Sequence, residues 1–186
     1  MYAILLAADV KILRTLQSHY PRVVNYQFQP LPESSPVECR YGHCVPVQST
    51  TTSLLEEAML RSHLNPAYHD FALFLIESGA SIGGQNITAY GVMYLAVQTM
   101  QPPIVIEACI KRGVARVSTA SIGLAVQQND QETLKTMFAN NRPTREEVSD
   151  KEIMQLAADA SAQCQVMPKC VRMLREYILA RQIQSR

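Results

Sequence analysis

The chain of 186 residues lacks several features that mark particular classes of protein. Its 17 basic and 16 acidic residues leave a net charge of +1, so no overall field favours nucleic acid or an acidic partner. No stretch approaches the roughly 18 apolar residues that a membrane span needs. The apolar start has no basic leader, so it does not resemble a secretory signal peptide. These absences favour an intracellular protein, and we expect a cytoplasmic location.

The sequence also lacks the clustered, even set of cysteines that marks a disulfide framework: its five cysteines are an odd number and widely spread. A chain of this length can bury a core without disulfides, so we expect reduced thiols. Cys109 occupies a leucine-like position in a helical pattern and is predicted to be a buried, unreactive residue.

One short segment, "CRYGHC", does bring Cys39, His43 and Cys44 together. Zinc needs four ligands, and the gap between the two cysteines is wider than a two-residue zinc knuckle. A thiol nucleophile needs an adjacent base, a third orienting group and an oxyanion hole, and no local signature supplies them. We therefore predict no catalytic residue, metal or cofactor. A zinc site, a loop disulfide and a small metal- or thiol-dependent enzyme built on these residues remain as alternatives.

What the sequence does contain is a recurring apolar helix that ends at glycine. In "DFALFLIESGASI" the apolar side chains cover most of a helical circumference, which indicates a helix packed between two neighbours. Gly79 follows at the position where a helix end favours a left-handed residue. The same pattern returns at 105–117, where Gly113 takes that position, and at 133–141, where Asn141 takes it.

Each of these helices follows another short apolar segment. The clearest copies share Leu-Ala-Val or end in small alanines, which allow two helices to approach closely; they lie at 91–97, 120–126 and 152–158, with weaker copies at 2–8 and 52–58. Paired helices that recur every 28–34 residues are typical of a solenoid, in which each repeat buries its face against its neighbours.

These segments resemble ankyrin repeats. "FALFLIESGASI" matches the second half of that repeat closely, and "ASIGLAVQQNDQETLKTMFANN" fits a whole helix pair. The match is good over 51–141 and poor over 1–20 and 150–181, and the Thr-Pro-Leu-His motif of the family is missing. The resemblance implies a single all-α domain over 1–186, an ankyrin-like solenoid of about five helix pairs. The first pair reads as one continuous helix, because no turn interrupts it.

Residues 21–50 do not fit the repeat. They hold five of the ten prolines, which excludes helix for most of the segment. We interpret them as a Pro-rich loop inserted between the first and second helix pairs. A loop of this length in a compact domain is usually functional or disordered.

The resemblance also implies a function, which is non-catalytic binding of a partner protein. In ankyrin-like stacks the projecting turns and the first helix of each pair form a concave binding face. On this sequence that face would include Gln85, Asn86, Thr88, Tyr90, Met93, Tyr94, Arg116, Ser118, Thr119, Gln127 and Gln128. Tyrosine, methionine and arginine are enriched at such surfaces.

Two further alternatives concern the partner. The chain could be a pathogen effector that uses the same stack on a host protein, in which case it would act inside a host cell. It could also associate with itself through residues 1–20, which carry many apolar side chains for a terminal repeat. We expect no nucleic acid and no membrane span.

Overall fold

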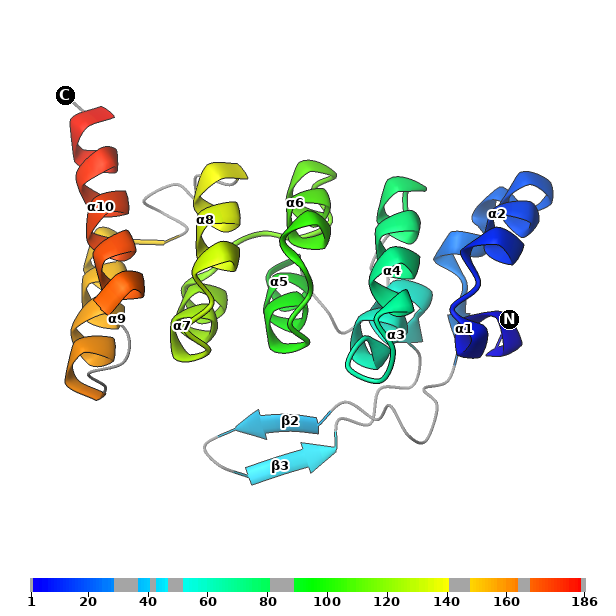
Figure 1. Ribbon diagram of the computed structural model, residues 1–186, viewed down its shortest axis with the longest axis horizontal. Coiled ribbons are helices and arrows are strands. Elements are labelled where there is room, and N and C mark those ends of the chain that lie inside the picture. Colours follow the sequence, from blue (N-terminus) through cyan, green and yellow to red (C-terminus); the bar gives the residue numbers. More distant parts are fainter. Residues whose placement is uncertain are drawn as a thin grey trace.

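The computed structural model describes residues 2–28, 37–40, 43–46, 52–80, 89–140, 148–163 and 168–184. These residues are mostly α-helical (Figure 1), which confirms the all-α prediction. The helices are α1 (Tyr2–Ala7), α2 (Val10–His19), α3 (Leu54–Arg61), α4 (Ala67–Glu77), α5 (Ala89–Gln98), α6 (Pro103–Lys111), α7 (Thr119–Gln127), α8 (Gln131–Asn140), α9 (Asp150–Gln163) and α10 (Pro168–Gln184). Within this part of the chain no helix is long and apolar enough to cross a membrane.

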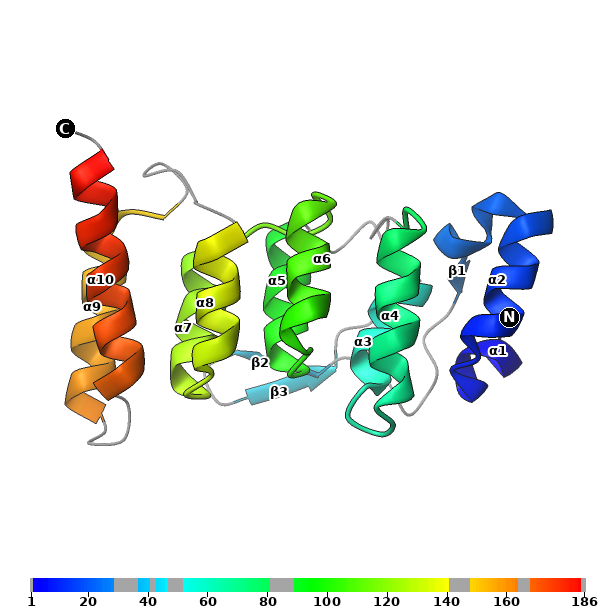
Figure 2. The ribbon, with the colours of Figure 1, turned by 45° about the horizontal axis from the view of Figure 1, so that its top comes forward.

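The helices lie in two rows (Figures 1 and 2). In the first row α3, α5, α7 and α9 contact one another in chain order, and in the second row α2, α4, α6, α8 and α10 do the same. Successive helices of the chain also pack together as α3 with α4, α5 with α6, α7 with α8 and α9 with α10. Each inner pair therefore buries its apolar residues against the pairs on either side, and each end pair buries them against its one neighbour.

Among the described residues, five helices end in the same hydrogen-bonded turn. After α4 and α6 the left-handed residue is glycine, with φ of +81° at Gly79 and +69° at Gly113, as predicted. After α1, α5 and α7 it is Ala8, Met100 or Asn129, with φ between 48° and 55°. In each turn two backbone N–H groups donate to carbonyls three and five residues earlier, which satisfies the last carbonyls of the helix. The predicted turn at Asn141 lies outside the described residues.

The first pair is not one continuous helix, and that prediction is wrong. The backbone turns at Ala8, and Asp9 then caps a second helix. The Asp9 carboxylate accepts hydrogen bonds from the backbone N–H groups of Lys11 (2.9 Å) and Ile12 (3.0 Å). An acidic N-cap therefore separates α1 from α2 without a glycine.

The Pro-rich insertion contains short regular elements. A 3₁₀ helix, η1 (Pro21–Asn25), follows α2, contacts α3 and buries Val24. Strand β1 (Gln27–Phe28) pairs antiparallel with β4 (Thr52–Ser53), so the segment leaves and rejoins the helices at one place. Strands β2 (Val37–Arg40) and β3 (His43–Pro46) form an antiparallel hairpin, which lies beside the first row in both views (Figures 1 and 2).

The core runs continuously through the stack. Fully buried side chains come from every pair, among them Leu5, Leu55, Phe71, Ile106, Ile122 and Leu174. Gly123 lies at a close approach of α7 to α9, because a Cβ there would lie 3.1 Å from the Leu156 side chain of α9. Glycine at this position lets α7 and α9 pack tightly.

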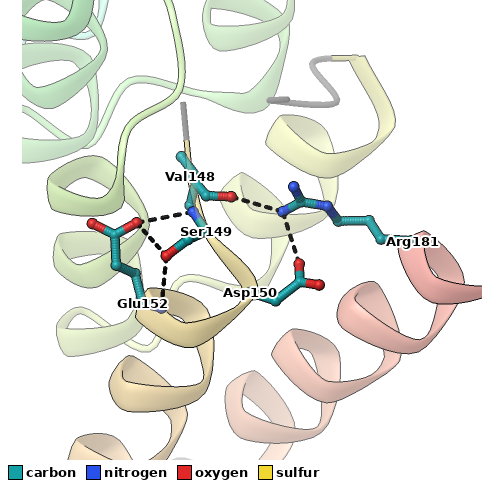
Figure 3. Close-up of polar contacts among 5 residues, drawn as sticks. All are labelled: Val148, Ser149, Asp150, Glu152 and Arg181. Atoms are coloured by element: carbon teal, nitrogen blue, oxygen red, sulfur yellow. Dashed lines mark hydrogen bonds and ion pairs between the residues drawn. The ribbon is translucent and has the colours of Figure 1, made fainter. Parts of the chain in front are cut away.

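The last pair is joined by a polar link (Figure 3). Arg181 on α10 donates from Nη1 to the Val148 carbonyl oxygen at 2.9 Å and lies 3.4 Å from the Asp150 carboxylate. Beside it, Ser149 and Glu152 exchange hydrogen bonds that cap the start of α9. Hydrogen bonds from the Ser149 backbone and side chain lower the pKa of Glu152. These contacts hold the end of α10 against the beginning of α9.

Candidate interaction surface

Helix α5 leaves a narrow line of side chains in solvent. Tyr94 and Gln98 are exposed one helical turn apart, whereas Val92, Leu95 and Ala96 are buried. Tyr94 therefore lies on the surface, as predicted. Met93 is fully buried and belongs to the core, so its assignment to the binding face is corrected. Most of the circumference of α5 is buried because the helix packs against α3, α6 and α7, and Met93 lies on that buried side.

The next pair contributes a more mixed surface. Gln127 and Arg116 are exposed, and Thr119 and Gln128 are half-buried. Ser118 has a structural task, because its Oγ accepts from the Ser121 N–H while the Ser121 hydroxyl caps the Ser118 N–H. Ser118 is therefore the N-cap of α7, and its side chain is occupied by that role.

The remaining predicted residues lie at the start of α5 and in the segment before it. Gln85, Asn86 and Thr88 lie outside the described residues, and so does the side chain of Tyr90. The structure thus places Tyr94, Arg116 and Gln127 on the surface of neighbouring pairs.

A cavity of about 380 Å³ opens beside Gln98. It lies between the turn that joins α3 to α4 and the turn that joins α5 to α6. Its walls are made by Leu60, Ser62, His63, His69, Leu95, Gln98, Thr99 and Met100. Met100 is 66% exposed, and Leu64, in the turn after His63, is 59% exposed. Large apolar side chains that stay in water beside a hollow are typical of binding surfaces.

A buried hydrogen-bond network supports one side of this cavity. The Gln101 side-chain nitrogen donates to the Met59 carbonyl (3.3 Å), the Ser62 hydroxyl (2.7 Å) and the Thr99 hydroxyl (3.0 Å). Ser62 in turn donates to the Met59 carbonyl at 2.7 Å. Gln101 and Ser62 are almost completely buried. Because the network joins two successive turns, it holds the walls of the cavity at a fixed separation.

Both histidines of the cavity are oriented by acceptors. His63 Nδ1 lies 2.6 Å from the Leu60 carbonyl oxygen. His69 Nδ1 lies 3.0 Å from Gln101 Oε1, and that oxygen is identified because the Gln101 nitrogen faces the Met59 carbonyl. A carbonyl oxygen can only accept, so each Nδ1 carries the proton and donates.

The thiols described by the structure are not activated. Burial raises the pKa of Cys109 to about 12, and Cys109 is fully buried as predicted. Burial also raises the pKa of Cys170, and nearby Asp130 adds to the effect. Since the thiolate is the nucleophile, a raised pKa works against reactivity at both residues.

Buried carboxylates lie on α3 and are not among the residues that line the cavity. Glu57 is fully buried and accepts from Arg61 Nε at 2.8 Å. Burial raises the pKa of neighbouring Glu56, and Glu57 adds to the rise. Arg61 is 4% exposed, so this ion pair is part of the interior and faces no ligand.

Cys39 lies on β2, and His43 and Cys44 lie on β3, in a register that pairs Cys39 with Cys44 and Arg40 with His43. Their side chains lie outside the described part of the structure. Among the residues that are described, no group of three or more His, Cys, Asp and Glu side chains could hold a metal ion.

Sequence reasoning missed the cavity. His63 lies in the α3–α4 turn, His69 lies near the start of α4 and Gln101 lies in the α5–α6 turn, and each residue alone reads as an ordinary polar residue. The available signal was the apolar Leu64 and Met100 at the turns, where polar residues are usual. Comparison of the chain with protein-family models, curated proteins and solved structures found no match.

Proposed function

We propose that the chain is a degenerate ankyrin-like repeat protein that binds a partner protein without catalysis. Support for the repeat comes from the two rows of helices and from the turn that recurs after five of them. One observation supports the binding function most directly. Tyr94 and Gln98 are exposed on α5, and Gln98 and exposed Met100 line the adjacent cavity.

The surface has the properties that protein binding requires. Tyrosine offers a large contact area with little loss of conformational freedom, and exposed Arg116, in the loop before α7, adds a charged group from the next repeat. The helices beneath are packed on both sides, so the backbone is ordered before a partner arrives. Less entropy is then lost on association, and modest contacts give useful affinity.

The test begins with affinity capture and mass spectrometry, followed by calorimetry with the recovered partner. We expect the Tyr94→Ala/Arg116→Ala double variant to bind about tenfold or more weakly, because truncated anchor residues often cost more than 1 kcal/mol each. Its thermal midpoint should stay close to that of the parent chain.

The matched control is Glu132→Ala/Lys135→Ala on α8, where both side chains are exposed and bonded only to each other. This control lies in the second row and should bind normally. Equal loss of affinity in both variants, or none in either, would contradict the proposed surface.

A further inference from the structure

We infer that the cavity between the α3–α4 and α5–α6 turns receives an aromatic side chain with a hydrogen-bond donor, a tryptophan or tyrosine of the partner protein. The inference rests on the proposed function, because it assigns the chemistry of the partner at that surface.

The first argument is the hydrogen bonding of the two imidazoles. Each neutral ring has one donor nitrogen, and in His63 and His69 that nitrogen already donates within the protein. Each Nε2 is then an acceptor, and both rings line the cavity. An indole N–H or a phenol O–H supplies what such acceptors lack.

The second argument is the apolar wall. Leu60 and Leu95 give aliphatic contact, and Met100 offers a thioether, which makes favourable contacts with aromatic rings. A cavity of about 380 Å³ is within the usual range for ligand sites and is ample for one side chain. Aromatic residues with one polar atom combine a large apolar surface with a single hydrogen bond.

The third argument is charge. None of the eight lining residues is a lysine, arginine, aspartate or glutamate. A charged side chain entering the cavity would lose hydration without gaining an ionic partner. The donor is therefore best carried by an uncharged ring. The Gln101 network keeps the walls in place, so the cavity is formed before binding.

The chain has no tryptophan, which makes a direct test possible. N-acetyltryptophanamide is titrated into the full chain, and its indole fluorescence is followed together with methyl NMR signals of Leu60, Leu95 and Met100. We expect saturable 1:1 binding that shifts those methyl signals. The 1-methylindole analogue, which has no N–H, should bind about fivefold to tenfold more weakly because one hydrogen bond is lost.

Two variants test the assignment of atoms. His63→Phe keeps an aromatic ring at an exposed position but removes the acceptor, so it should reduce the preference for the N–H probe. Met100→Gly removes the sulfur and should weaken both probes, although it is expected to stabilise the fold for reasons given below. Arg175→Ala, on the exposed face of α10, should bind as the parent chain does.

Several results would overturn the inference. These are no saturable binding up to the solubility of the probe, equal affinity for the methylated analogue, or shifts confined to other parts of the molecule. If the probe gave one of these results but the chain still captured a partner through Tyr94 and Arg116, the proposed function would be retained without the inference about the cavity. Indole binding in a chain that captures no partner would support the cavity and count against the proposed function.

Discussion

At the scale of single residues, the helix-ending turns carry unequal backbone strain. Gly79 and Gly113 adopt a left-handed conformation without penalty, because glycine has no Cβ. Met100 adopts the same conformation with a bulky side chain, which costs roughly 1–2 kcal/mol. Its side chain is mostly in water and recovers little of that cost by packing. A strained, exposed methionine at the edge of a cavity is consistent with a role in binding.

Replacing Met100 by glycine should therefore stabilise the protein by about 1 kcal/mol. Urea unfolding followed by circular dichroism would show this as a higher midpoint with an unchanged slope. The comparison is Arg175→Gly, at an exposed position inside α10, which should lower stability by about 1 kcal/mol. A Met100→Gly variant that is less stable than the parent would show that the methionine side chain contributes packing that outweighs its strain.

The same residues show how far local sequence can predict structure. Gly79 and Gly113 were predictable because glycine is the preferred residue at that turn. Ala8 and Met100 were not, because no intrinsic preference favours them there and tertiary packing imposes the conformation. Met93 was misplaced for a related reason. Met93 and Tyr94 are adjacent, and only the packing of α5 against three helices decides which one is buried.

At the scale of elements, the final pair depends on its polar link as well as on its core. Arg181 joins the end of α10 to the start of α9, and its guanidinium also lies 5.6 Å from the centre of the Tyr177 ring. Tyr177 stacks on Phe138 of α8, with ring centres 4.0 Å apart. One arginine thus connects contacts that involve three helices.

Arg181→Ala should destabilise this end of the molecule by about 2 kcal/mol. The Val148 carbonyl would lose a charged donor in a partly buried setting, where such bonds contribute about 1.5–3 kcal/mol. The control is Arg175→Ala, two turns earlier on the exposed face of the same helix, for which we expect a change within about 0.5 kcal/mol. Thermal unfolding would separate the two, and equal effects would refute a specific role for the link.

Elements were predicted unevenly from the sequence. The expected segments at 91–97, 120–126 and 152–158 lie inside α5, α7 and α9, because their apolar periodicity is strong. The sequence does indicate the break between α1 and α2, because Asp9 is a favoured N-cap residue. The break was not predicted because no glycine precedes Asp9 to mark the end of α1. The pairing of β1 with β4 could not be predicted, since it joins two-residue strands across a Pro-rich segment.

At the scale of the whole molecule, stability should decrease from the centre toward both ends. The middle pairs are covered on two sides, whereas α1 and α2 at one end and α9 and α10 at the other are covered on one. Exposed Leu6 and Ile12 at the first end, and Leu179 and Ile183 at the last, reflect this open packing. Stacks of this kind have stabilities set largely by contacts with neighbours.

Hydrogen exchange measured by mass spectrometry should show that gradient. We expect the slowest exchange in α5 to α8 and the fastest in α1, α2 and the end of α10, because local opening requires less free energy where fewer contacts are lost. Uniform protection from α1 to α10 would contradict this expectation and indicate a single cooperative unit.

The cavity, by contrast, could be recognised only at this scale, because His63, His69 and Gln101 meet only when two pairs are stacked.

The two termini lie at opposite ends of the row (Figure 1), and this has a mechanical consequence. Tension applied between them acts along the direction in which the pairs are stacked. Each interface then bears the load in series with the others. Under an optical trap such a chain should lengthen in small successive steps, so that an outer pair can yield while the rest stays folded.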